Sequence, residues 1–197
     1  ASMEGRRFER AAGGPGTGPE RAAHLARIDD EAQYRDRMVA PVAVAFVVLQ
    51  AVLWLGAVLA LRSGAARTQR RVAWAALAML AYLPATYLAG LLSFAGAPAL
   101  AYWGFVLGTA GALATVATLV GRRRVLDPLL LCLGLVFGLL AVDMLFGAPL
   151  QLNTVFGYSP TVGGRFAGMG NLAYGQFAGA AFLLCGLLSR RLAGRSF

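Results

Sequence analysis

Five long apolar stretches, separated by short connections, set the hydrophobic pattern of the chain. Each is close to the roughly 20 residues that an α-helix needs to cross a bilayer, and none alternates like a β-strand. Lipid offers no hydrogen bonds to the backbone, so spanning segments of this kind must be helical. The pattern therefore predicts an all-α, polytopic membrane protein with about five transmembrane helices. Their expected bounds are about residues 39–61, 72–92, 99–120, 128–147 and 170–189.

The residues before the first apolar stretch form two further segments. Residues 1–19 include the sequence AAGGPGTGP, and glycine and proline at this density predict a flexible linker. Residues 20–38 are charged, rich in alanine and free of glycine and proline, which predicts an exposed juxtamembrane helix. Residues 39–197 would then make up the transmembrane helical bundle.

Composition and charge agree with a membrane protein and indicate its orientation. The chain is 58% hydrophobic, and all 18 of its basic residues are arginine. The arginines gather in the connections 62–71 and 121–127 and in the C-terminal tail, whereas the alternate connections contain only Arg165. Basic connections lie in the cytoplasm, so we expect a multi-pass protein of the bacterial cytoplasmic membrane with residues 1–38 outside and the tail inside. Because the arginines flank the spans, the net charge of +9 does not indicate a nucleic-acid partner.

The expected outside position of residues 1–38 bears on the extent of the chain. This segment has seven arginines and seven acidic residues, so its charge does not resist export. Nothing in it would start export, however. We therefore predict a piece of a longer chain with a preceding span or extracytoplasmic domain; the alternative is a self-contained protein with its N-terminus outside.

Polar side chains within the apolar pattern fall in the halves of the spans that this topology places outside. The least regular segment, 150–177, reads LQLNTVFGYSPTVGGRFAGMGNLAYGQF, and its residues 150–169 are expected to be irregular or re-entrant before the fifth span begins. A carboxylate such as Asp143 costs roughly 2.5–3.5 kcal/mol inside a spanning helix, so it needs a partner, for which Arg165 is the candidate. Either the pair fixes the loop, or Arg165 holds a phosphate or carboxylate group as a planar fork of donors. The candidate ligand-binding residues are Arg165, Asp143, Asn171, Tyr158, Gly168, Gly170, Gln176 and Tyr87.

The sequence offers no catalytic or metal-binding constellation. Cys132, Cys185 and the single histidine, His24, lack the spacing of a metal site. The sequence GMGNLA matches a dinucleotide motif only formally, because no strand precedes it, and Ser159 has no base nearby. We therefore expect no metal and no cofactor, and any hydrolytic or transfer chemistry would belong to a missing ectodomain.

Three pairs of glycines have the GxxxG spacing, beginning at Gly104, Gly134 and Gly175. Such pairs let helix backbones approach closely. We expect them to pack within the bundle; the alternative is a dimer interface.

Two stretches resemble a family of large, mostly uncharacterised bacterial, actinobacterial-type integral membrane proteins. They are YLPATYLAGLL (82–92) and DMLFGAPLQLNTVFGYSPTVGGRFAGMGN (143–171). The resemblance implies that Asp143, Arg165, Gly168, Gly170 and Asn171 are motif positions, and that an extracytoplasmic domain similar to alkaline phosphatases belongs to the same polypeptide. Gly90 departs from the asparagine of the family pattern. The short sequence RFAGMGN is also similar to an outer-site motif of O-antigen polymerases and ligases.

These observations favour the membrane module of a cell-envelope protein. Its outward-facing polar site is expected to bind an anionic lipid-linked or phosphate-bearing ligand, and its other partners are membrane lipids. The alternatives are a small transporter or flippase subunit and a purely structural anchor or scaffold.

Overall fold

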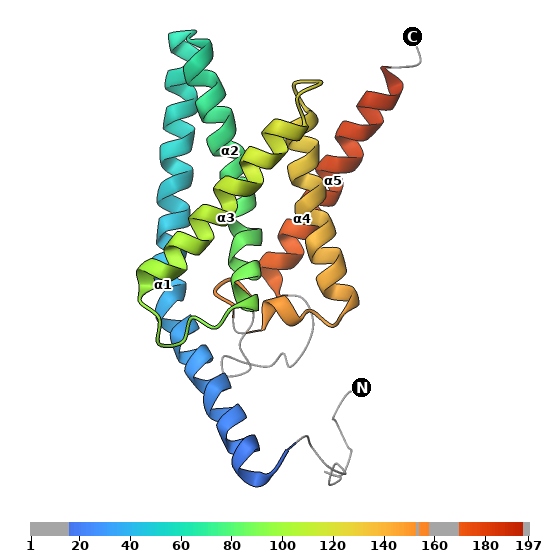
Figure 1. Ribbon diagram of the computed structural model, residues 1–197. Coiled ribbons are helices and arrows are strands. Elements are labelled where there is room, and N and C mark those ends of the chain that lie inside the picture. The colour runs from blue at the N-terminus through green and yellow to red at the C-terminus, as the bar shows by residue number, and fades with distance from the viewer. Residues whose placement is uncertain (1–15, 153, 158–169, 195–197) are drawn as a thin grey trace.

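The computed structural model describes residues 16–152, 154–157 and 170–194. The described residues contain five helices that are long and apolar enough to span a membrane, which confirms the predicted all-α class (Figure 1). Two one-turn 3-10 helices, η1 and η2, follow the second and fourth of them. The elements are α1 (Gly18–Ser63), α2 (Ala66–Leu88), η1 (Ala89–Leu91), α3 (Ala99–Val120), α4 (Asp127–Leu145), η2 (Pro149–Gln151) and α5 (Asn171–Ala193).

Helix α1 joins the predicted juxtamembrane segment to the first predicted span without a break. It has 46 residues and contains Pro41 in its interior. At 1.5 Å per residue it is about 69 Å long, more than twice the roughly 30 Å thickness of a bilayer core. Its first part therefore extends beyond the bundle (Figure 1). It ends at Ser63, and the next residue, Gly64, has a φ of 65° in the left-handed region that favours glycine.

The connections between helices lie at two opposite ends of the bundle (Figure 1). One end, here the arginine end, has the α1–α2 and α3–α4 connections and the last turns of α5. There Arg191 of α5 forms an ion pair with Asp127 at the start of α4, with 3.0 Å between Nη1 and Oδ1. The other end, here the loop end, has η1, η2, Thr154–Gly157 and the start of α5. The three arginine-rich segments thus share one end, as the sequence predicts.

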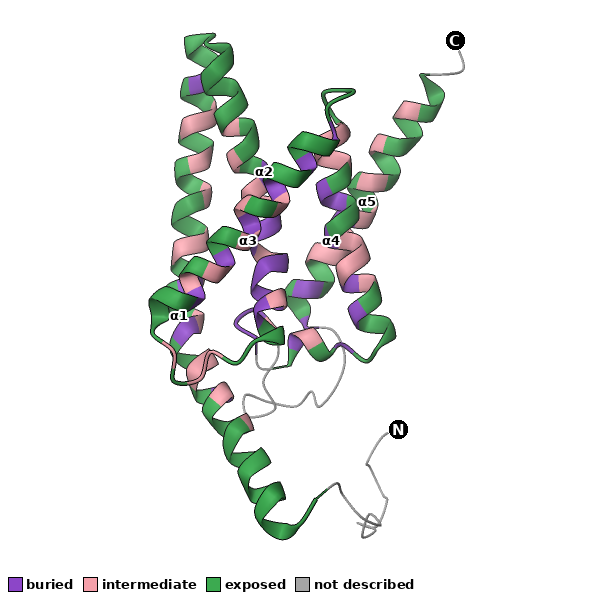
Figure 2. Cartoon of the chain, in the orientation of Figure 1, coloured by how far each residue is buried: buried purple, intermediate pink, exposed green. Residues whose placement is uncertain are grey.

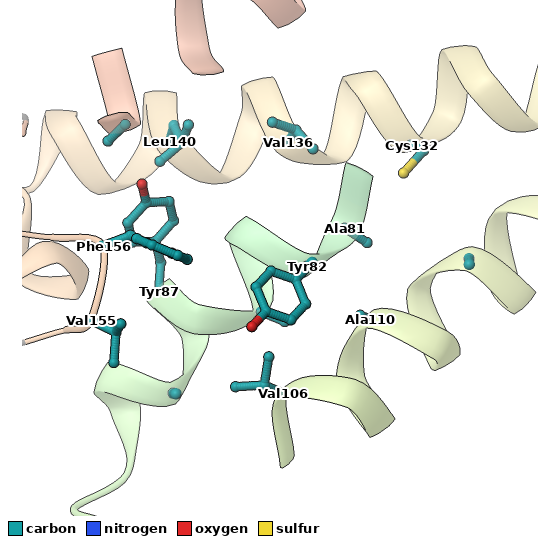
Figure 3. Close-up of a cluster of buried hydrophobic side chains, with 14 of the residues drawn as sticks. Ala81, Tyr82, Tyr87, Val106, Ala110, Cys132, Val136, Leu140, Val155 and Phe156 are labelled. Carbon is teal, nitrogen blue, oxygen red and sulfur yellow. The ribbon is translucent and has the colours of Figure 1, made fainter. Parts of the chain in front are cut away.

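Helix α2 lies in the middle of the packed core and contacts α1, α3 and α4. Small buried residues let these helices approach: Ala81 and Ala85 of α2 and Ala110 and Ala114 of α3. Figure 3 shows Ala81 and Ala110 between α2 and α3, with Val136 of α4 on the other side of α2. The upper part of α1 and most of α5 are exposed along the remaining faces (Figure 2), as expected for helices that contact lipid.

The prediction that the GxxxG glycines pack within the bundle was wrong. A Cβ added at any of these glycines would meet no atom within 4 Å. The physical reason is that alanines occupy the faces where the helices meet, so the glycine faces point away from the core. The six glycines are Gly104, Gly108, Gly134, Gly138, Gly175 and Gly179.

Candidate functional site

Asp143 is the one acidic residue in the described cores of the spans, and the turn after α4 folds back to meet it. It lies in the last turn of α4 and is 3% exposed. Its Oδ1 accepts a hydrogen bond from the backbone N–H of Leu150 at 2.8 Å, and its Oδ2 accepts one from the side-chain amide of Gln151 at 3.0 Å. Its carbonyl oxygen accepts from the N–H of Ala148 at 2.7 Å. Both carboxylate oxygens are therefore engaged by the chain itself.

The turn that brings these donors to Asp143 is strained. Ala148 has a φ of 62°, in the left-handed region that residues with a Cβ rarely adopt, and it is fully buried. Such a conformation costs of order 1–3 kcal/mol and persists where surrounding contacts determine it. Here the contacts are the hydrogen bonds to Asp143, so the carboxylate stabilises an otherwise unfavourable turn.

Gln151 extends these contacts to the next helix. It is fully buried, and its side-chain oxygen accepts a hydrogen bond from the N–H of Gly170, the N-cap residue of α5, at 2.8 Å. Its own carbonyl oxygen accepts from the hydroxyl of Thr154 at 3.2 Å. A buried polar chain of this kind is favourable when its members are satisfied. We call it the Asp143–Gln151–Gly170 network.

The network brings together the two residues that flank segment 158–169. A Cβ placed on Gly170 would lie 3.8 Å from the carbonyl carbon and oxygen of Gly157. A Cβ on Gly157 would overlap the backbone carbonyl of Gln151 and the hydroxyl of Thr154, so only glycine fits there. Gly157 and Gly170 therefore lie close together, against Gln151.

Arg35 of α1 holds the same loop from the other side. Its side chain is 12% exposed. Its Nε donates to the carbonyl oxygen of Thr154 at 3.0 Å and its Nη2 to that of Gly157 at 3.4 Å. Its Nη1 pairs with Asp36 at 2.7 Å. The guanidinium thus connects the helix that enters the bundle with the loop between η2 and segment 158–169.

A cavity of about 250 Å³ lies beside this loop. Its walls come from α1, from Thr86 of α2, from η1 and the connection after it, from α3, and from Leu152, Thr154 and Val155. Gly90 forms part of the wall, and a Cβ there would lie 2.5 Å from Cγ2 of Thr154 and 3.1 Å from the carbonyl oxygen of Leu150. This close approach excludes a larger residue at position 90.

The structure distributes the predicted site residues unevenly. Asp143 and Gly170 belong to the network. Tyr87 is fully buried, its hydroxyl is directed toward α4 near Leu140 (Figure 3), and it has no hydrogen-bond partner among the described residues. Asn171 is exposed at the first position of α5, and Gln176 is partly buried one turn further on. Tyr158, Arg165 and Gly168 lie outside the described residues, so the Asp143–Arg165 pair stays a prediction.

Two important residues of this site carry no clear signal in the sequence. Arg35 is one of seven arginines before the first span, and nothing in their spacing separates it from the others. Gln151 belongs to the polar segment that the sequence singles out, but a lone amide after a helix is common. Only the fold shows that Gln151 lies between Asp143 and Gly170.

Among the described residues, the Asp143 carboxylate has a structural role. Both of its oxygens accept hydrogen bonds from the chain segment that follows α4. Among the described residues no three His, Cys, Asp or Glu side chains gather as a metal site. The free thiols, Cys132 and Cys185, lie on α4 and α5 far along the helices from Asp143.

No protein-family model, curated protein or solved structure matches the chain. The resemblance to integral membrane proteins with a phosphatase-like ectodomain therefore stays a prediction.

Proposed function

We propose that the chain is the membrane module of a bacterial cell-envelope protein and that its loop end binds an anionic, phosphate-bearing or lipid-linked ligand. The observation that supports the proposal is that Gly157 and Gly170, the described residues that flank segment 158–169, lie close together beside Gln151 of the Asp143–Gln151–Gly170 network. That segment contains Arg165 and three of the chain's glycines.

In this proposal Arg165 contacts the ligand and Asp143 acts through the loop. Arginine presents five donors in a planar fork that matches phosphate and carboxylate oxygens. Glycines beside it let backbone N–H groups approach the same anion. Asp143 has both oxygens committed to Leu150 and Gln151, so its role is to position the segment. This refines the expectation that Asp143 orients Arg165 directly.

The proposed orientation puts the loop end outside the cytoplasm. The arginine end contains the basic connections, and basic connections remain on the cytoplasmic side. A ligand at the loop end would then be a component of the outer leaflet or of the envelope beyond it. Helix α1 points away from the bundle at this end (Figure 1), where a preceding extracytoplasmic domain of the same polypeptide would join.

Native mass spectrometry of the protein in phosphatidylcholine nanodiscs tests the proposal. Phosphatidic acid, added at a few per cent, is the anionic probe. Arg165→Gln should reduce retained phosphatidic acid, because it removes the charge and the fork. Arg122→Gln, at the arginine end, is the matched control and should leave this loop-end binding unchanged.

The outcome that contradicts the proposal is equal retention by the Arg165→Gln variant and the unmodified protein, with both folded. The second candidate, a structural scaffold, would then be favoured. One observation already fits a scaffold: both carboxylate oxygens of Asp143 and the side-chain oxygen of Gln151 accept hydrogen bonds from within the chain.

A further inference from the structure

A groove of about 100 Å³ lies between α2, α3 and α4 and shares no lining residue with the cavity at the loop end. Its accessible surface comes from four leucines that remain partly exposed: Leu88, Leu113, Leu135 and Leu139. Leu135 is 45% exposed, whereas Ala81, Cys132 and Val136 behind the leucines are each 1% exposed. Figure 3 shows Cys132 and Val136 directed from α4 toward α2. The groove therefore opens outward, where spanning helices face lipid.

The lining of the groove is hydrocarbon apart from one thiol. That thiol, of Cys132, donates to the backbone carbonyl oxygen of Leu77 at 3.7 Å, so the described lining side chains offer a ligand no free hydrogen-bonding group. Apolar cavities of about 150 Å³ stay free of water and take up apolar molecules instead. The chemistry that fits this groove is therefore a hydrocarbon chain.

The depth of the groove matches the chains of the leaflet at the loop end. Leu139 and Leu135 come six and ten residues before Leu145, where α4 ends. At 1.5 Å per residue they lie about 9 and 15 Å below that end along the helix axis. One leaflet covers about 15 Å, half of the roughly 30 Å hydrocarbon core. A lipid whose headgroup lies at the loop end therefore reaches the groove with its chain.

The groove also continues toward the Asp143–Gln151–Gly170 network. Side chains three or four residues apart lie on one helix face. Cys132, Val136 and Leu139 line the groove with that spacing on α4, and Asp143 comes four residues after Leu139. Asp143 thus lies about 6 Å further along the same face. A molecule with its chain in the groove has its polar end at the level of the network.

We infer that the ligand of the loop end is a lipid phosphate, whose hydrocarbon chain lies in the groove between α2, α3 and α4. The inference rests on the proposed anion site and narrows its ligand class, because a free phosphate ester has no chain to place there. A chain that leaves lipid for the groove gains no hydrophobic transfer energy, so the groove contributes van der Waals contacts and orientation. The phosphate supplies the larger part of the affinity.

Photo-crosslinking in phosphatidylcholine nanodiscs tests where the chain lies. The probe is phosphatidic acid with a diazirine in one acyl chain, added at a few per cent, and labelled positions are identified by mass spectrometry after digestion. We expect labels at Leu113 and Leu139. Leu135→Trp, which fills the groove, should lower them about fivefold or more, the factor for about ten lost carbon–carbon contacts.

Leu131→Trp is the matched control. Leu131 lies one turn before Leu135 on α4, is 38% exposed and stands outside the described groove walls, so this change should leave the labels unchanged. Leu113→Phe narrows the groove from α3 and replaces Leu135→Trp if that variant does not fold. Arg165→Gln should also lower the groove labels, because it releases the phosphate that positions the chain.

The possible failures separate this inference from the proposed function. Equal labelling by a diazirine phosphatidylcholine, insensitive to Arg165→Gln, would mean that ordinary membrane lipid fills the groove. If phosphatidic acid retention depends on Arg165 but the labels survive Leu135→Trp, the anion site stands and its link to the groove is refuted. Full competition by millimolar glycerol 3-phosphate would likewise show that the phosphate alone is recognised. Retention that does not depend on Arg165 would remove the proposed function and this inference together.

Discussion

Exchanging the carboxylate of Asp143 and the amide of Gln151, by Asp143→Asn and Gln151→Glu, tests the network at the loop end. The site offers two donors to residue 143, the N–H of Leu150 and the amide of Gln151. Asp143→Asn leaves one oxygen and introduces an N–H₂ group, so one contact becomes donor against donor. Rotation of the Gln151 amide moves the conflict to the N–H of Gly170 without removing it. Because hydrogen bonds to charged groups contribute about 1.5–3 kcal/mol, we expect a loss of that size.

The reverse single change, Gln151→Glu, places two carboxylates in contact. In the unmodified protein, Oδ2 of Asp143 lies 3.0 Å from the Gln151 amide nitrogen, and the substitution puts a carboxylate oxygen in place of that nitrogen. One carboxyl must then take up a proton. For a glutamate with an ordinary pKa of about 4.3, protonation at pH 7 costs about 3.7 kcal/mol. The two single changes together would lower the free energy of unfolding by about 5–7 kcal/mol if they were independent.

The double variant Asp143→Asn/Gln151→Glu restores every pairing. The new asparagine accepts from the Leu150 N–H and donates to the new glutamate, whose second oxygen accepts from the Gly170 N–H. One negative charge remains, as in the unmodified protein. We therefore expect stability within about 1 kcal/mol of the original, and a coupling energy of at least about 3 kcal/mol between the two positions.

Unfolding by increasing fractions of sodium dodecyl sulfate in mixed micelles, followed by circular dichroism, measures these differences. The matched control is Asp29→Asn, because Asp29 accepts from the Gln33 amide at 2.8 Å on an exposed face of α1. Exposed pairs contribute little, so this change should stay within about 0.5 kcal/mol. Additive single effects in the double variant would refute the network.

Three further predictions concern the same end of the bundle. Gly157→Ala should lower the free energy of unfolding by about 1–3 kcal/mol, because a Cβ there overlaps backbone; Gly134→Ala, which faces open space, should be neutral or stabilising by up to about 1 kcal/mol. Arg35→Gln should speed hydrogen exchange and proteolysis of the loop after η2, since two carbonyls lose a charged donor, and unchanged rates would contradict that role. In a background without Cys185, an impermeant maleimide should label Ser93→Cys but not Ser63→Cys in intact cells, and the opposite pattern would reverse the proposed orientation.

The hydrophobic pattern determined the class of the protein, because length and apolarity alone decide which segments can leave water for lipid. The five spans are present in the structure, and the arginine-rich segments share one end. The need of Asp143 for buried partners also followed from the sequence, since the cost of an unpaired carboxylate does not depend on the fold.

Only the tertiary structure decided which partners these are. Gln151 lies beside Asp143 because the strained turn at Ala148 reverses the chain, and Arg35 reaches Thr154 across 119 positions of sequence. The prediction that the GxxxG glycines pack within the bundle failed for the same reason. Their spacing puts them on one helix face, but the packing of the other helices determines whether that face is covered. Spacing along a chain determines local geometry, whereas the meeting of distant side chains depends on how the helices pack.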